Sequence, residues 1–191
     1  MKVLVACEYS GVVSTAFKAK GHYVLSVDLL PSEGFDNHYT GDIFSVPKIE
    51  SPGEWDMLIA FPPCTYLCRA QAGLLAHDQG RYEKHLKAIE FVRRLWTLPI
   101  PKIAIENPVG FLSTKWMKPT QITSFNHFGD PYYKDICLWL KGLPVLRSTD
   151  IVPGTKRVSN HVNSRMSQAL KSKIKSKFLP GIAKAMSEQW T

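Results

Sequence analysis

One cysteine of the chain stands where its thiol could act as a nucleophile. Cys64 follows Pro62 and Pro63, which end the apolar run from Asp56 to Phe61, a predicted buried strand. The two prolines fix the backbone beyond the strand, so the thiol is expected on a rigid rim. Thiolate is the reactive form, and a nearby cation, for which Arg69 is a candidate, would lower the pKa of Cys64. The alternative is a buried, inert cysteine.

A carboxyl group closes another predicted strand further along the chain. Glu106 ends the run from Lys102 to Glu106 and is followed by Asn107 and Pro108. Burial penalises an ionised carboxylate, so Glu106 is expected to have a raised pKa and to donate a proton. Carboxyl ends of parallel strands meet at one edge of a sheet, so Cys64 and Glu106 are expected on a common rim. A surface Glu before a turn is the alternative.

Two aspartates suggest a nucleoside site. Asp28 closes the predicted strand from His22 to Val27, where an acid can accept hydrogen bonds from ribose hydroxyls. Asp42 could reach an adenine amino group. Because no G-x-G-x-x-G follows the first strand, a nucleoside without phosphates fits better than a dinucleotide, and S-adenosylmethionine is such a nucleoside. Each Asp taken alone could instead be a turn or cap residue.

The elements that must position these residues alternate between strand and helix. Predicted strands cover residues 2–7, 22–27, 56–61 and 102–106. One predicted helix begins near residue 12, and another covers residues 79–97. This alternation indicates a parallel α/β sheet with helices on both faces. Residues 121–125 and 135–140 lack a long helix between them and predict an antiparallel edge or hairpin. The apolar stripe of the long helix is predicted to be Leu86, Ile89, Val92 and Trp96.

Composition and charge narrow the class of protein. The 191 residues are 45% hydrophobic and carry a net charge of +8, with a basic block between Arg147 and Lys184. Such a block favours a polyanionic partner, although a solvated lysine face is the alternative. The four cysteines show no secreted disulfide pattern or zinc spacing, and no apolar run is long enough for a membrane span. We therefore expect a cytoplasmic protein with no metal and no membrane partner.

The motifs, taken in order, resemble those of the DNA cytosine C5-methyltransferases. Phe61–Cys64 (FPPC) is similar to the Pro-Cys nucleophile motif of that family, and Ile105–Pro108 (IENP) to its Glu-Asn-Val motif. Cys7–Gly11 (CEYSG) resembles the first cofactor motif, and Gly41–Phe44 (GDIF) matches the third, whose Asp contacts adenine. The resemblance touches most of the chain up to about residue 140, and more weakly its end.

The chain departs from the family in several places. Val12, Val13 and Ser14 replace a second glycine-rich step. Phe128–Leu140 resembles the Phe-Gly-x-Pro-Gln-x-Arg-x-Arg segment, but Tyr132, Lys134 and Ile136 stand at its Gln, Arg and Arg positions. The last arginine of that segment helps to hold the cytosine in the family. In this chain, another residue must hold the base, or the base is held more weakly. Short members of this type, often encoded by phages, can have very simple specificity.

The resemblance implies a fold and a division of the chain. The implied fold is α/β, a Rossmann-like S-adenosylmethionine-dependent methyltransferase fold with a mostly parallel sheet, an antiparallel edge hairpin and a small basic C-terminal extension. The expected parts are a catalytic domain (1–142), a short basic loop-rich segment in place of a target-recognition region (143–177) and a C-terminal helix that packs back (178–191). The oligomeric state is left open.

The resemblance also implies roles for individual residues. Cys64 would attack C6 of cytosine in DNA, Glu106 would protonate N3, and Asn107 completes the expected catalytic set. The expected S-adenosylmethionine-binding residues are Tyr9, Ser10, Gly11, Asp28, Leu29, Asp42, Ile43, Phe61 and Pro63. The expected DNA-binding residues are Arg69, Lys134, Lys156, Arg157 and Arg165.

Three rival functions follow from the same residues. Amino-methyltransferases carry the motif Asn/Asp-Pro-Pro-aromatic. Phe61 and Cys64, which stand at the two ends of the Pro-Pro step here, argue against that class. A catalytically weakened DNA-binding homologue is favoured by Ile136 and the missing glycines. C5 modification of another cytosine-containing substrate is the third alternative, against which the basic block argues.

Overall fold

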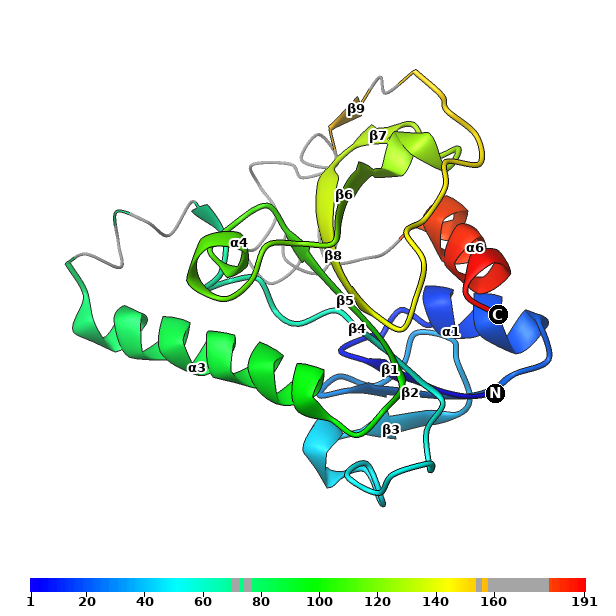
Figure 1. Cartoon of the computed structure of the whole chain (residues 1–191), viewed down its shortest axis with the longest axis horizontal. Coiled ribbons are helices and arrows are strands. Elements are labelled where there is room, and N and C mark those ends of the chain that lie inside the picture. Colours follow the sequence, from blue (N-terminus) through cyan, green and yellow to red (C-terminus); the bar gives the residue numbers. More distant parts are fainter. Residues whose placement is uncertain (70–72, 74–76, 154–155, 158–178) are drawn as a thin grey trace.

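The central element of the protein is a seven-stranded sheet. A computed structural model describes residues 1–69, 73, 77–153, 156–157 and 179–191. The strands are β1 (Lys2–Ala6), β2 (Tyr23–Asp28), β3 (His38–Thr40), β4 (Met57–Ala60), β5 (Lys102–Pro108), β6 (Gln121–Ser124) and β8 (Asp135–Lys141). Their order across the sheet is β3-β2-β1-β4-β5-β8-β6 (Figure 1). Two short strands, β7 (Tyr132–Tyr133) and β9 (Lys156–Arg157), pair separately in parallel.

The direction of the strands confirms the predicted mixed sheet. The five strands from β3 to β5 are parallel, whereas β8 runs antiparallel to both β5 and β6. The carboxyl ends of β1, β2, β4 and β5 therefore lie along one edge. Because β8 is reversed, it is its amino-terminal end that lies at this same edge, next to the end of β5.

Helices cover both faces of the sheet. The helices are α1 (Val12–Ala19), α3 (Gln79–Thr97), α4 (Leu112–Lys115) and α6 (Pro180–Gln189), with single turns η1 (Ile43–Ser45) and η3 (Phe125–His127). Side chains alternate along a strand, so β1 sends Val3 and Val5 into one apolar cluster and Leu4 and Ala6 into the other. The first cluster lies under α1 and α6, and the second lies under α3 and α4 (Figure 1).

The buried face of α3 differs from the prediction by a rotation of the helix. Leu86 was expected in the apolar stripe, but its exposed fraction is 47%, so this prediction was wrong. The buried residues of α3 are His85, Ile89, Val92 and Leu95. Each set covers about 120° of the helix circumference, and the centre of the buried set is rotated by about 60° from that of the predicted stripe.

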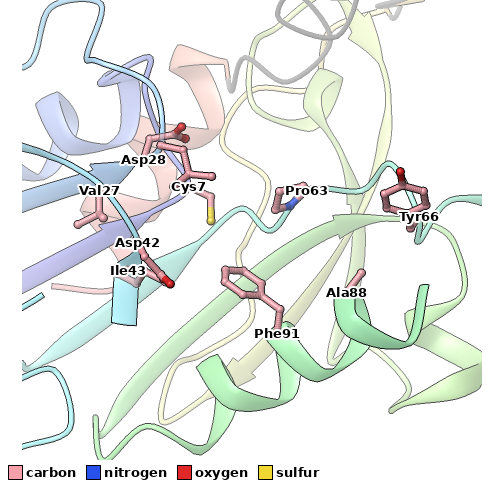
Figure 2. A pocket seen from close by; sticks show the side chains of 11 residues that line it. Cys7, Val27, Asp28, Asp42, Ile43, Pro63, Tyr66, Ala88 and Phe91 are labelled. Carbon is pink, nitrogen blue, oxygen red and sulfur yellow. The ribbon is translucent and has the colours of Figure 1, made fainter. Parts of the chain in front are cut away.

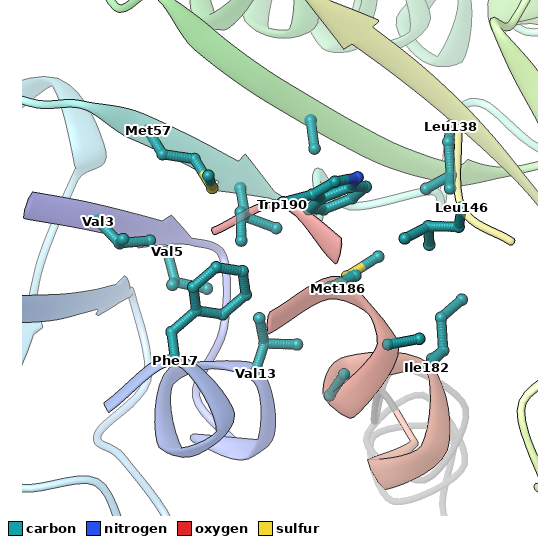
Figure 3. Packing of buried hydrophobic residues seen from close by; sticks show 14 of the residues in the cluster. Val3, Val5, Val13, Phe17, Met57, Leu138, Leu146, Ile182, Met186 and Trp190 are labelled. Carbon is teal, nitrogen blue, oxygen red and sulfur yellow. The ribbon is translucent and has the colours of Figure 1, made fainter. Parts of the chain in front are cut away.

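The C-terminal helix packs against the amino-terminal helix. Met186 and Ile182 of α6 meet Val13 and Phe17 of α1 over the sheet (Figure 3). The backbone N–H of Gly181 donates to Asp130 Oδ2 (3.1 Å) at the start of α6. At the other end, Trp190 Nε1 donates to the Pro144 carbonyl (3.0 Å). Both ends of the final helix are therefore tied to the strand-rich part of the chain.

Residues 154–155 and 158–178, which make up more than half of the predicted basic segment 143–177, lie outside the described residues. Among the residues that the structure does describe, no helix has both the length and the apolar character needed to cross a membrane.

Candidate active site

Two adjoining cavities open at the carboxyl edge of the parallel strands. The first, here called the Asp42 cavity, has a volume of about 330 Å³ and is lined by Cys7, Val27, Asp28, Leu29, Gly41, Asp42, Ile43, Pro63, Tyr66, Ala88 and Phe91. The second, the Cys64 cavity, has a volume of about 320 Å³. Its lining residues are Cys7, Glu8, Tyr9, Ser10, Asp28, Leu30, Phe61, Pro62, Pro63, Cys64, Thr65, Glu106, Pro108 and Lys134. Each volume suits one small organic ligand.

The two cavities share a wall. Cys7 at the end of β1, Asp28 at the end of β2 and Pro63 beyond β4 line both of them. Ligands that occupied the two cavities together would therefore meet at these three residues.

The Asp42 cavity combines apolar walls with carboxylates at one side (Figure 2). Asp28 Oδ1 accepts from the backbone N–H of Leu30 (2.9 Å), and Asp42 Oδ1 accepts from that of Phe44 (3.0 Å). Ile43 and Phe91 supply apolar surface from η1 and α3. The arrangement can hold a flat ring between apolar side chains and present acceptors to hydroxyl or amino groups.

Phe91 is itself fixed by a small stack. The ring of Phe44 meets it edge-on at 5.5 Å between centroids, and the guanidinium of Arg94 lies 3.6 Å from the Phe44 centroid. This contact joins η1 to α3, the two elements that supply Ile43 and Phe91 to the Asp42 cavity.

The shared wall is electronegative. Burial, together with the nearby charges of Asp28 and Asp42, raises the pKa of the Cys7 thiol to about 12. Cys7 is therefore a neutral thiol at physiological pH. The same two carboxylates that disfavour a thiolate would favour a cation bound at this wall.

A buried carboxylate occupies the N-terminus of α1. Glu8 is 4% exposed, and its oxygens accept from the backbone N–H groups of Val13 (2.6 Å) and Ser14 (3.1 Å) and from Ser14 Oγ (2.5 Å). A helix N-terminus is a ready site for an anion, and here the chain fills it with its own side chain. A phosphate group has no place there, which agrees with the missing glycine-rich loop.

The turn before α1 requires its glycine. Gly11 has a φ of +71°, and a Cβ at this position would lie 2.7 Å from Phe35 Cβ. Gly11 faces a groove between α1 and α6, while Tyr9 and Ser10 line the Cys64 cavity. Gly11 thus has a role in the turn, and its expected contact with the cofactor stays a prediction.

Cys64 and Glu106 line the same cavity. Cys64 is exposed at the rim. Glu106 is 7% exposed, and its Oε1 atom has no hydrogen-bond partner among the described residues. Burial raises the pKa of Glu106, and the charge of Lys134 opposes that rise. A buried carboxyl group in this state holds a proton that a ligand in the cavity could accept.

Contacts between two loops position this pair. Asn107 Nδ2 donates to the Pro62 carbonyl (2.8 Å), and the backbone N–H of Phe111 donates to the Leu67 carbonyl (2.8 Å). Gly110 lies directly against the Leu67 carbonyl, which leaves no room for a Cβ. Asn107 therefore holds the backbone of Pro62, two residues before Cys64. Asn107 was placed in the catalytic set because of the family resemblance, not because of this contact. Sequence reasoning missed Gly110, whose only signal was a glycine two residues after Pro108.

The electrostatics of Cys64 correct one expectation. Although Cys64 is exposed at the rim, the protein around its thiol removes part of the hydration and so raises its pKa. The Glu106 carboxyl group raises this pKa further, while Lys134 lowers it. Arg69 was the expected cation, but it is exposed on the loop beyond the cysteine. The amino-terminal end of β8 lies at the end of β5, and this is why Lys134, just before β8, reaches the site.

The remaining predicted residues are distributed as follows. Leu29 and Ile43 line the Asp42 cavity, and Phe61 lines the Cys64 cavity. Lys156 and Arg157 form β9, which pairs with Tyr132 and Tyr133 just before Lys134. Arg165 lies outside the described residues. Within the described ranges, no three His, Cys, Asp or Glu side chains are grouped so that they could hold a metal ion.

Comparisons with solved structures show the fold. The structure of the Entamoeba histolytica methyltransferase EhMeth superposes with a TM-score of 0.53 at 14% sequence identity, over 88% of this chain and 62% of that one. The chain thus has the Rossmann-like fold of methyltransferases and spans less than two thirds of the length of EhMeth. No protein-family model and no curated protein sequence matches the chain.

Two further structures overlap more loosely. The bifunctional kinase-methyltransferase WbdD gives a TM-score of 0.43 at 14% identity, over 80% of this chain and 37% of that one. A mutant of Spodoptera frugiperda DNMT2 gives 0.42 at 13% identity, over 88% and 61%.

Proposed function

We propose that this protein transfers a methyl group from S-adenosylmethionine to C5 of cytosine in DNA through a covalent bond between Cys64 and C6. One observation carries the proposal: Cys64 and the buried, unpaired Glu106 line one cavity, and this cavity shares a wall with a second one suited to a nucleoside. A thiol and a proton-donating carboxyl group beside a nucleoside cavity are the groups that pyrimidine C5 chemistry requires.

The Asp42 cavity fits S-adenosylmethionine. Asp28 would accept from the ribose hydroxyls and Asp42 from the adenine amino group, with Ile43 and Phe91 against the ring. The electronegative wall at Cys7 suits a sulfonium cation. Glu8 fills the N-terminus of α1, so a phosphorylated nucleoside would meet a carboxylate there. When bound, S-adenosylmethionine supplies an electrophilic methyl group.

The residues of the Cys64 cavity would carry the other half of the reaction. The Cys64 thiolate, having lost its proton to solvent, forms a bond to C6, and the electrons of the C5–C6 double bond move through C4 to N3. Glu106 delivers its proton to N3, so C5 becomes the nucleophilic carbon of an enamine. After C5 has accepted the methyl group, a water molecule takes the C5 proton. The C5–C6 double bond re-forms, Cys64 leaves as thiolate, and the N3 proton returns to Glu106.

The cytosine has to leave a DNA duplex to reach these groups. Extrusion of a base costs a few kcal/mol of stacking and pairing, which contacts to the phosphate backbone must offset. The basic residues proposed for this task are Arg69, Lys134, Lys156, Arg157 and Arg165.

The direct test is methyl transfer from tritiated S-adenosylmethionine to cytosine-containing DNA. We expect transfer by the native chain and by the control variant Cys68→Ser, and none by Cys64→Ser, which should still bind DNA. DNA that carries 5-fluorocytosine should form a covalent adduct with the native chain and with Cys68→Ser but not with Cys64→Ser, because elimination requires loss of a C5 proton. A fully active Cys64→Ser variant would remove Cys64 from the mechanism, and label on free dCTP instead of DNA would identify a nucleotide substrate.

The raised pKa of Cys64 favours a second candidate, a DNA-binding homologue with weakened catalysis. Because the thiol is largely protonated at neutral pH, addition to C6 would be slow unless bound substrate changes its surroundings. The two candidates differ in one readout: a weakened homologue retards DNA in a gel but forms no 5-fluorocytosine adduct.

A further inference from the structure

A third cavity lies beside α3 and α4. Here called the His85 cavity, it has a volume of about 430 Å³. The described residues that line it are Tyr82, His85, Leu86, Lys87, Ile89, Glu90, Arg93 and Lys115. All but Lys115 belong to α3, where spacings of three and four residues bring side chains to one side of a helix. None of these residues lines the Asp42 cavity or the Cys64 cavity, so a ligand here would be additional to cofactor and substrate.

One polar side chain of this cavity is buried with only one of its two ring nitrogens in use. His85 is 3% exposed, and its Nδ1 lies 2.7 Å from the Tyr66 carbonyl oxygen. Because a carbonyl oxygen can only accept, Nδ1 carries a hydrogen, and Nε2 of the neutral ring is a bare acceptor. Nε2 has no hydrogen-bond partner among the described residues. Phe111 meets the imidazole edge-on at 5.0 Å between centroids. The ring is thus fixed, with Nε2 available to a ligand.

The charge around the cavity favours an anion. Lys87, Arg93 and Lys115 line it and are exposed, and Glu90 is the acid among its described lining residues. None of the ion pairs between described residues includes any of these four side chains. Guanidinium and ammonium groups without a carboxylate partner are the groups that bind phosphate in proteins.

Apolar surface lies next to these charges. Tyr82 and Leu86 line the cavity and are 45% and 47% exposed. The Tyr82 ring lies 6.3 Å from that of His85, centroid to centroid. A half-exposed aromatic ring can stack on any nucleobase, because every base has a π-face. Cations for a phosphate and a ring for a base together match a mononucleotide, and the volume suits one small ligand.

We propose that the His85 cavity binds a mononucleotide, whose phosphate lies between Arg93, Lys115 and His85 Nε2. Its base packs against Tyr82. A phosphate dianion has no hydrogen to donate to Nε2, so a proton must enter with the ligand and lie between Nε2 and a phosphate oxygen. The site does not depend on the proposed function, because it shares no residue with the cysteine chemistry.

The site is connected to the Asp42 cavity through Tyr66. With a proton on Nε2, the hydrogen bond from Nδ1 to the Tyr66 carbonyl becomes charge-assisted and therefore stronger. Tyr66 lines the Asp42 cavity and follows Cys64 by two residues. A mononucleotide at His85 thus holds this wall more firmly, and binding at the two cavities is mutually favourable.

The first test is calorimetric titration of the full chain with GMP. GMP should bind more tightly than guanosine or inorganic phosphate, since each of these offers half of the recognised groups. Arg93→Met and Lys115→Met should each raise the Kd for GMP about tenfold, and the control Lys184→Met, exposed on α6, should keep the native Kd. Absence of GMP binding, equal binding of guanosine or phosphate, or native affinity in both variants would overturn the proposal.

The second test follows the proton. Titrations near pH 8 in buffers of different ionisation enthalpy should show net proton uptake by the native chain and none by His85→Asn, whose amide can still donate to the Tyr66 carbonyl. The other groups that face the cavity are Tyr82, Lys87, Glu90, Arg93 and Lys115. Lysine and arginine already carry their protons at this pH. Equal uptake by the two proteins contradicts the contact at Nε2, and melting curves show whether His85→Asn folds.

The third test compares GMP binding with and without saturating S-adenosylhomocysteine. We expect the Kd for GMP to fall about fivefold or more, and GMP to tighten S-adenosylhomocysteine by the same factor. If GMP occupied the Asp42 cavity instead, the two ligands would compete, and the proposal would fail. Displacement of GMP by a DNA duplex would also overturn it, by identifying backbone phosphate as the ligand. If S-adenosylhomocysteine does not bind at all, the proposed function fails, while the first two tests still decide the His85 cavity.

Discussion

At the scale of single residues, the site contains acids and thiols whose pKa values have been moved in one direction. Burial raises the pKa of Cys7, Cys64 and Glu106, so each of them holds its proton longer than it would in water. For Glu106 this suits a proton donor. For Cys64 it opposes formation of the thiolate nucleophile, and the charge of Lys134 only partly counters the rise.

The variant Glu106→Gln separates catalysis from cofactor binding. An amide has no acidic proton for N3, so we expect kcat to fall about 10²- to 10³-fold. The affinity for S-adenosylhomocysteine, measured by calorimetry, should stay the same, because Glu106 does not line the Asp42 cavity. Equal turnover of the two proteins would contradict the role given to Glu106.

The same variant makes a prediction about stability. The pKa of Glu106 is raised in the folded state, so the folded protein binds more protons than the unfolded chain once the pH exceeds the usual carboxyl range. Its favourable contribution is present at low pH and is lost as the pH rises through the raised pKa. Glu106→Gln should therefore melt higher than the native chain at pH 8, at about 2–4 °C per kcal/mol, and this advantage should disappear at pH 4. A constant difference between the two melting curves would refute this account.

At the scale of elements, the sequence predicts where the strands of the site end. It does not predict which strand pairs beside β5. Cys64 and Glu106 each follow an apolar run, so their common edge follows from parallel strand order. Lys134 reaches that edge because β8 is inserted antiparallel next to β5, and no local pattern encodes this pairing. The face of α3 was missed because Leu95 and Trp96 are both apolar, which leaves the phase of the helix open.

The contact between the two site loops should be sensitive to a single methyl group. In Gly110→Ala the new Cβ would collide with the Leu67 carbonyl and push the Cys64 segment away from the end of β5. We expect a loss of about 1–3 kcal/mol of stability in urea unfolding and a large fall in methyl transfer. Gly34→Ala is the matched control, since nothing lies within 4 Å of the added atom. Comparable losses in both variants would show that the Gly110 contact has no special role.

The start of α6 depends on one carboxylate. Asp130 accepts from the backbone N–H groups of Gly181 and Ile182, which satisfies free donors at the helix N-terminus. Asp130→Ala should destabilise the protein by about 1 kcal/mol, as is typical when such a cap is lost. Asp150→Ala is the control in the same chemical denaturation experiment, because Asp150 is exposed nearby. Its contact with the Gly129 N–H is made by the backbone carbonyl, which the substitution keeps.

At the scale of the whole molecule, the two cavities lie at the carboxyl edge of the parallel strands, beyond β1, β2, β4 and β5. The Asp42 cavity draws on β2, η1 and α3, and the Cys64 cavity adds the ends of β1 and β5. A ligand in the first cavity would thus connect the end of β2 with η1 and α3, which pack on one face of the sheet. We expect S-adenosylhomocysteine at a hundred times its Kd to add about 2.7 kcal/mol to the free energy of unfolding.

The carboxylate of Asp28 offers a test of this ligand effect. Asp28→Asn should lower the thermal shift caused by S-adenosylhomocysteine, because an amide is a weaker acceptor for the ribose hydroxyls than a carboxylate. Asp36→Asn, an exposed position before β3, should keep the full shift. If both variants respond like the native chain, the ribose does not bind at Asp28.

The carboxylate of Glu8 at the start of α1 has a consequence for selectivity. ATP and related molecules present the same adenine and ribose as S-adenosylmethionine, but they add several negative charges. Glu8 already accepts hydrogen bonds from the backbone N–H groups of Val13 and Ser14, which a phosphate would need, so discrimination arises from an element of the protein that touches neither base nor sugar. An abundant competitor is thereby excluded because the donors that its phosphates require are already occupied.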